Sequence, residues 1–165
     1  MAKINSQRKG RSAERDVSKI LNERFGDGKK VFSPTPSSGA WGGGQNRERR
    51  IDMSLEQKMT LVSDIMTPPD FRFILESKFY ADISFWDLFN ESSKLRDWIE
   101  QVVSDSSFVG KEPFLVMKFN RKPKIAMTKI DAPGKVFTFY YKNESWHCYL
   151  FEDLLSFERE WWFLS

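Results

Sequence analysis

Residues 71–80 constrain this chain more than any other segment, because an apolar run there carries two opposite charges. In a strand, side chains alternate between two faces, so Glu76 and Lys78 point the same way, on the face opposite Phe73 and Leu75. A strand this apolar is expected in the middle of a sheet, where both charges lose solvation unless each has a partner. The pair is therefore a salt bridge, internal or on an edge strand, or part of a functional site.

The remaining patterns predict a single mixed α/β domain in which helices flank a mixed β-sheet. Helices are expected over residues 12–25, with Ser12 as N-cap, over 84–104, and over a short C-terminal stretch at 151–161. The predicted strands cover residues 30–33, 61–66, 71–80, 113–119, 124–127, 135–141 and 146–150. Within the domain of residues 1–165, the motifs fall in 1–122. Residues 123–165 are expected to complete the fold or form a dimer interface.

Composition excludes several classes of protein. One cysteine, Cys148, and one histidine, His147, cannot form a disulfide framework or a Cys/His zinc site within one chain, so any metal must be held by carboxylates. No stretch approaches the ~18 apolar residues of a membrane helix, and no apolar region follows the charged N-terminus. We therefore expect a soluble cytoplasmic protein without membrane contact, in the host cytoplasm if a phage encodes it.

Charge is unevenly distributed along the chain. Residues 1–50 contain 12 Lys or Arg against 5 Asp or Glu, a net +7, whereas residues 144–165 contain 1 against 5, a net −4. A basic N-terminal region of this kind is typical of contact with nucleic acid or another acidic surface. Charge alone is equally compatible with a solvated basic arm.

Two further carboxylates stand out. At ~100° per residue, Glu14 falls beside Val17 and Leu21 on the apolar side of its helix, so it needs a partner, unless it is a first-turn acid stabilised by the helix dipole. Asp64 precedes Glu76 by one turn and one strand, and antiparallel pairing would bring the two together. Asp52 is the rival aspartate, but it requires a longer connection.

Glu14, Asp64 and Glu76 together would supply hard oxygen ligands of the kind that Mg²⁺ prefers, with Mn²⁺ as an expected substitute. In this scheme Asp64 and Glu76 are the principal ligands, and Glu14 is a further ligand or a water-mediated partner. Lys78 would orient the attacking water and offset negative charge that develops in the reaction.

The ordered motifs resemble the PD-(D/E)xK nuclease superfamily and, within it, archaeal Hjc-type Holliday junction resolvases and their phage relatives. The matching segments are residues 9–15, 35–40, 63–65, 73–78 and 98–101. The resemblance implies a restriction-endonuclease-like fold, a homodimer and metal-dependent cleavage of branched, four-way DNA. Two departures are the long segment from Gly39 to Asp64, which contains Asp52, and the region after about residue 123, which matches no part of the family pattern.

Several residues are candidates for DNA contact or for support of the site. Lys9, Arg11 and Arg15 could contact phosphates, which would make binding strongly salt-dependent, and Ser38 could donate hydrogen bonds from its loop. Gln101 is expected to position other residues of the site without contacting the metal or the substrate. The alternatives to a junction resolvase are another nuclease on the same scaffold, restriction-like or end-processing, and a DNA-binding protein whose carboxylates are structural.

Overall fold

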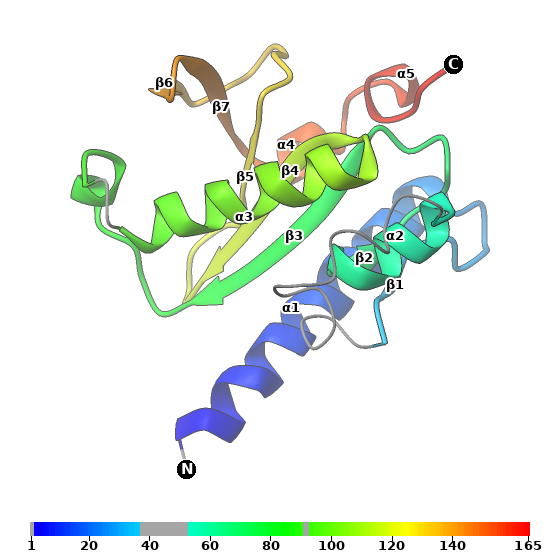
Figure 1. The fold of residues 1–165 in the computed structure, drawn as a ribbon, viewed down its shortest axis with the longest axis horizontal. Helices are drawn as coiled ribbons and strands as arrows, with labels where there is room; N and C mark the ends of the chain where they lie inside the picture. Colours follow the sequence, from blue (N-terminus) through cyan, green and yellow to red (C-terminus); the bar gives the residue numbers. More distant parts are fainter. Residues whose placement is uncertain (1, 37–52, 91–92) are drawn as a thin grey trace.

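The strands of the chain form one seven-stranded sheet in the order β1-β2-β3-β4-β5-β7-β6 (Figure 1). The computed structural model describes residues 2–36, 53–90 and 93–165. Its strands are β1 (Ser33–Pro34), β2 (Ile65–Met66), β3 (Phe73–Tyr80), β4 (Glu112–Phe119), β5 (Ile125–Thr128), β6 (Phe137–Tyr141) and β7 (Glu144–Leu150). The neighbours β3 and β4 are parallel, and every other pair in the sheet is antiparallel. The sheet is therefore mixed, as predicted.

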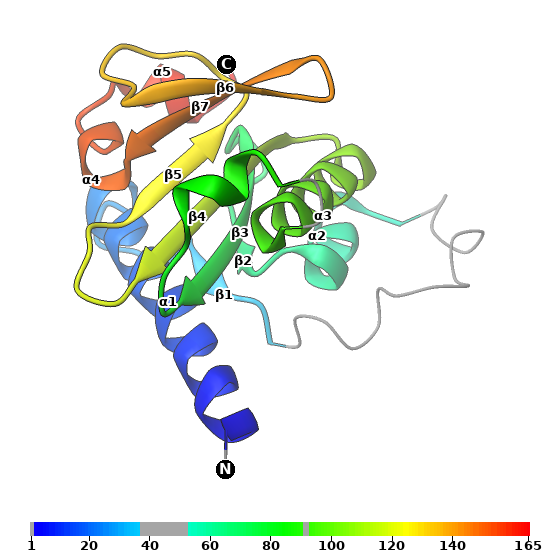
Figure 2. The same ribbon diagram turned by 90° about the vertical axis from the view of Figure 1, so that its left-hand side faces the viewer.

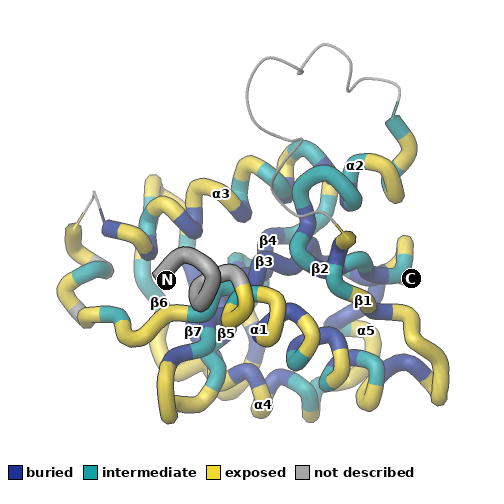
Figure 3. The backbone as a smooth tube through the Cα atoms, turned by 90° about the horizontal axis from the view of Figure 1, so that it is seen from below, coloured by how far each residue is buried: buried dark blue, intermediate teal, exposed yellow. Residues whose placement is uncertain are grey.

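Helices cover both faces of the sheet (Figures 2 and 3). On one face lie α1 (Ala2–Phe25), α4 (Phe151–Leu154) and α5 (Arg159–Trp162), which contribute to one hydrophobic core. On the other lie α2 (Leu55–Val62) and α3 (Lys94–Val109), which contribute to a second core. Within the part of the chain that the structure describes, no helix has the length and apolar character needed to cross a membrane.

The alternation predicted for residues 71–80 is confirmed. Phe73 and Leu75 are buried in the core on the α1 side, whereas Ile74 is buried in the core on the α3 side. Since Glu76 and Lys78 continue the even-numbered face, both project towards α3. The strand is central, so the charged pair sits inside the fold and not on an edge strand.

The first helix begins ten residues earlier than predicted. It starts at Ala2, so Ser12 is not its N-cap and Glu14 lies near its middle, beyond the stabilising end of the helix dipole. The added turns are rich in polar residues with adequate helix propensity and carry no apolar stripe. Hydrophobic periodicity could therefore not detect them.

Several other predicted boundaries were wrong, and the strand predicted over residues 30–33 begins only at Ser33. Leu61 and Val62 end α2, which begins with a capping box between Ser54 and Gln57, so only Ile65–Met66 remains as a strand. The helix predicted over residues 84–104 is interrupted: Ser84 and Asp87 cap a separate 3₁₀ helix, η2 (Phe85–Leu88), and Ser93 caps α3.

The predicted apolar stripe of the longer helix is confirmed, with Leu95, Trp98, Ile99 and Val102 buried against the sheet. The C-terminal helix predicted over residues 151–161 is instead two short helices, α4 and α5. Residues 155–158 between them turn the chain, so that Trp162 reaches the α1-side core.

The end of α1 is fastened to the segment before β1 by one side chain, Asn22. Its amide nitrogen donates to the carbonyl oxygens of Ser18 (2.9 Å) and Phe32 (2.7 Å). Its carbonyl oxygen accepts from the backbone N–H groups of Val31 (2.8 Å) and Phe32 (2.9 Å). Asn22 thus satisfies backbone groups on two elements at once.

We expect Asn22→Ala to lower the free energy of unfolding by about 2–3 kcal/mol, because several partly buried hydrogen bonds are lost together. The neighbouring substitution Glu23→Ala is the control: it removes only an exposed ion pair with Lys19 and should change stability by less than about 0.5 kcal/mol. Urea unfolding of both variants measures the difference. Equal stabilities would contradict the assigned role of Asn22.

Candidate active site

Asp64 and Glu76 are brought together by the pairing of β2 with β3. The strands are antiparallel, with Ile65 opposite Leu75, as predicted from the sequence. The backbone N–H of Asp64 donates to the carbonyl oxygen of Leu75 (3.3 Å), and the Oδ2 atom of Asp64 accepts from the backbone N–H of Ser77 (2.8 Å). The aspartate side chain is thereby directed towards the middle of β3.

The two carboxyl groups form a pair in which Glu76 is buried and Asp64 is partly exposed. Glu76 is only 2% exposed, and its side chain interacts directly with that of Asp64. Burial, followed by the negative charge of Asp64, raises the pKa of Glu76 to about 8, and burial also raises the pKa of Asp64. A hydrogen bond between two carboxyl groups requires a proton on one of them, and these pKa directions are consistent with a shared proton.

Lys78 lies beside this pair and is held from two sides. Its Nζ atom donates to Oε1 of Glu76 and to Oε1 of Gln101 on α3, the latter at 3.0 Å. The positive charge of Lys78 opposes the rise in the pKa of both Asp64 and Glu76. Gln101 therefore lies next to the site, as predicted, and its contact is with the lysine.

Glu14 is buried on α1, which covers the face opposite α3. Burial and the charge of Asp64 raise its pKa, while Arg11, Arg15 and Lys78 oppose the rise. Asp64 and Lys78 thus influence the charge of Glu14, although α1 and α3 cover opposite faces of the sheet. The inward orientation inferred from the helical spacing agrees with this burial.

The carboxylates fit a magnesium ion as a pair. Among the described residues, no group of three or more His, Cys, Asp or Glu side chains is arranged to hold a metal ion, so Glu14 does not complete a three-ligand set with Asp64 and Glu76. Mg²⁺ is commonly held by one or two carboxylates, with water and substrate phosphate filling the other positions. The Asp64–Glu76 pair would supply such ligands, and a bound cation would offset the repulsion between the two carboxylates.

The candidate DNA-binding residues occupy different parts of the chain. Lys9, Arg11 and Arg15 are exposed along α1, and the Nζ atom of Lys9 lies 5.8 Å from the centroid of the Phe79 ring. Because α1 starts at Ala2, these residues lie along the helix and not at its beginning. Ser38 and the rival aspartate Asp52 fall outside the described residues.

Two contributions to the site were not anticipated. The backbone N–H of Ser77 fixes Asp64, and the charge of Asp105 on α3 raises the pKa of Glu76 further. Asp105 follows Gln101 by four residues, so both occupy the same side of the helix. That spacing would have identified Asp105 once Gln101 was assigned to the site.

Comparison with protein families matches residues 5–150 to a family described as "Phage putative PDDEXK endonuclease". Comparisons with curated proteins and with solved structures gave no match. The matched range runs from α1 to the end of β7 and includes Glu14, Asp64, Glu76 and Lys78. Motif order, the mixed sheet and the acid pair with its lysine agree with this match. The chain therefore belongs to the phage PDDEXK endonuclease family, within the PD-(D/E)xK nuclease superfamily.

Proposed function

We propose that this endonuclease is Mg²⁺-dependent, acts on DNA and cuts four-way junctions. The observation that carries the metal-dependent chemistry is the contact between the partly exposed Asp64 and the buried Glu76, with Lys78 alongside. Neither carboxyl group is placed where water could fully solvate its charge, which is a costly arrangement for a purely structural pair. The preference for junctions is supported by the motif resemblance to Hjc-type resolvases.

Asp64 and Glu76 would hold the metal through their carboxylate oxygens. When bound, Mg²⁺ supplies a water of lowered pKa and positive charge to stabilise the phosphoryl oxygens. The hydrogen bond from Ser77 keeps Asp64 oriented, so that residue needs little rearrangement to act as a ligand. Glu14, buried on the other face near Asp64, would act through a water molecule.

Lys78 would provide the cation that meets the substrate. In the structure its ammonium group donates hydrogen bonds to both Glu76 and Gln101. Once Glu76 is committed to the metal, the contact with Gln101 still restrains the ammonium group beside the site. From there Lys78 can donate to the attacking water or to a phosphoryl oxygen and offset the developing charge.

A junction resolvase must cut two strands at symmetric positions. The described part of one chain contains one such acid pair. Two active centres would therefore come from two chains, and a two-fold symmetric homodimer would match the symmetry of the junction. This is the oligomeric state that we propose.

Asp64→Asn and Glu76→Gln should each reduce cleavage by at least about 100-fold, because each change removes a metal ligand. The control is Asp16→Asn, a carboxylate on α1 that pairs with Lys118 and Lys124 away from the acid pair. The assay uses four-way junction, linear duplex and single-stranded DNA, each with Mg²⁺ or with chelator. Retained cutting in both site variants would refute the assignment.

The same assay separates the alternative functions. Equal cutting of linear duplex and junction would replace junction resolution by a more general nuclease activity. DNA binding with no cutting under any divalent metal would indicate a protein whose carboxylates are structural.

Mg²⁺ affinity should rise with pH up to about 8, since the metal must displace the proton that Glu76 holds. Titration calorimetry should therefore give at least about tenfold tighter binding at pH 8.5 than at pH 6.5.

In the metal-free protein, folded Glu76 binds a proton between about pH 4.5 and 8 and unfolded Glu76 does not, so the free energy of unfolding should fall as pH rises through this window. Glu76→Gln should remove both dependences; their persistence would contradict the role of Glu76.

Lys78→Met should abolish cleavage, because the ammonium group that stabilises the reacting phosphate is lost. It should not weaken Mg²⁺ binding, because the positive charge that is removed repels the metal. Lys94→Met is the matched control: Lys94 is exposed and donates to the hydroxyl of Tyr80, beyond the acid pair. Calorimetry and cleavage rates together distinguish the outcomes. Loss of Mg²⁺ binding in Lys78→Met would assign the lysine a structural role instead.

A further inference from the structure

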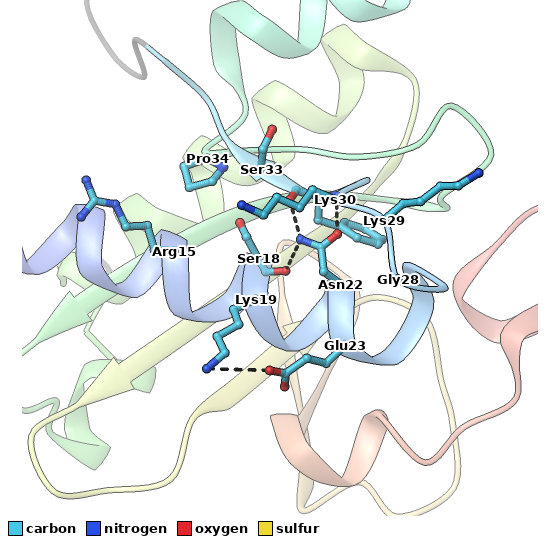
Figure 4. A pocket seen from close by; sticks show the side chains of 11 residues that line it. Arg15, Ser18, Lys19, Asn22, Glu23, Gly28, Lys29, Lys30, Ser33 and Pro34 are labelled. Carbon is cyan, nitrogen blue, oxygen red and sulfur yellow. Dashed lines mark hydrogen bonds and ion pairs between the residues drawn. The ribbon is translucent and has the colours of Figure 1, made fainter.

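A pocket of about 840 Å³ lies between α1 and the segment that leads into β1 (Figure 4). Ser18 and Asn22 line it from α1, and Lys30 and Phe32 line it from the opposing segment. None of these residues belongs to the acid pair. The pocket is therefore a separate feature of the surface near the candidate active site.

The hydroxyl group of Ser18 in this pocket has no hydrogen-bond partner among the described residues. Ser18 is only 3% exposed, and its Oγ atom is unsatisfied, although its carbonyl oxygen accepts from Asn22. Burying a hydroxyl group without a partner is unfavourable, and native structures seldom retain one without a reason. A ligand atom that accepts a hydrogen bond would satisfy it.

The rim of the pocket is positively charged. Arg15, Lys29 and Lys30 contribute three cations, and none of them forms an ion pair with a described carboxylate. Figure 4 shows Lys30 extending over the pocket, with Arg15 and Lys29 at its two ends. The remaining charges on the rim, Lys19 and Glu23, pair with each other at 3.8 Å. The uncompensated cations favour an anionic ligand.

Two elements that line the pocket also lead to the candidate active site. Arg15 directly follows Glu14 on α1. On the other wall, the strand β1 leads to Thr35, whose backbone N–H donates to the carbonyl oxygen of Asp64 (3.0 Å). A strand of DNA that passes the acid pair could therefore extend into the pocket.

The geometry points to this pocket as a second phosphate-binding site, which takes a backbone phosphate of the DNA strand beyond the one that is cut. Lys29 and Lys30 supply the charge, and the hydroxyl of Ser18 donates to the ligand. The volume exceeds that of a phosphate group, so the neighbouring sugar also fits. The inference rests on the proposed function, because it assumes that DNA is the substrate. A free nucleotide has the same phosphate chemistry and is distinguished by the test.

The first test measures DNA affinity as a function of salt concentration in chelator, where no cleavage occurs. The double variant Lys29→Ala/Lys30→Ala should reduce the slope of log affinity against log salt by about two, since each lost phosphate contact removes about one. At 0.1 M salt its affinity should fall about tenfold or more. The control, Lys135→Ala/Lys142→Ala, removes the same charge near β6, at the opposite edge of the sheet, and should leave the slope unchanged.

Ser18→Ala tests the hydroxyl without changing the charge. Because it removes a buried polar atom that has no partner, the variant should be at least as thermally stable as the original chain. If the hydroxyl binds phosphate, DNA affinity should nevertheless fall by about threefold or more, with the salt slope unchanged. A hydroxyl with a purely structural role would give unaltered DNA binding.

Equal slopes for the two double variants, or unchanged DNA affinity of Ser18→Ala, would overturn the inference. Calorimetric titration with deoxyadenosine monophosphate tests whether the ligand is a free nucleotide. The pocket would be assigned to free nucleotides if the nucleotide bound tightly, if Ser18→Ala abolished this binding, and if Lys29→Ala/Lys30→Ala left the salt slope of DNA binding unchanged. Absence of cleavage with the expected salt slopes would refute the nuclease proposal and leave the phosphate site intact.

Discussion

The contact between the carboxyl groups of Asp64 and the buried Glu76 is the interaction on which the rest of the site depends. It exists because β3 lies in the middle of the sheet and β2 pairs with it antiparallel, so the end of one strand meets the centre of the other. The backbone of Ser77 and the side chain of Lys78 then compensate part of the unfavourable burial. A cation that binds both carboxyl groups would complete this compensation, which connects the electrostatics of the fold with metal-dependent chemistry.

The helices divide the supporting roles between the two faces of the sheet. From one face, α3 contributes Gln101 to hold the lysine and Asp105 to raise the pKa of Glu76. From the other face, α1 contributes Glu14 near Asp64 and, one turn later, the buried Ser18 of the basic pocket. Family membership supports nuclease activity, and this arrangement supplies a physical basis for the proposed residue roles.

Much of the site could be predicted because strand geometry is local and repetitive. The alternation in residues 71–80 predicted that Glu76 and Lys78 lie on the same face of the strand. The short connection between Asp64 and Glu76 predicted that their two strands pair antiparallel. Boundaries were less accessible: the polar start of α1 has no apolar stripe, and η2 and α3 each have their own serine cap within what looked like one helix. The pocket could not be predicted, because it depends on how Asn22 fastens the segment before β1 to a distant turn of α1.

The length and continuity of α1 have a mechanical consequence. A helix rises about 1.5 Å per residue, so the four residues from Glu14 to Ser18 set a separation of about 6 Å along its axis. Rotation of side chains leaves this backbone spacing unchanged, and bending the helix is opposed by its buried contacts with the sheet. If both positions engage one DNA strand, α1 holds the two points of contact at a fixed spacing. The position of the cut is then set by its distance from the neighbouring phosphate and not by the base sequence.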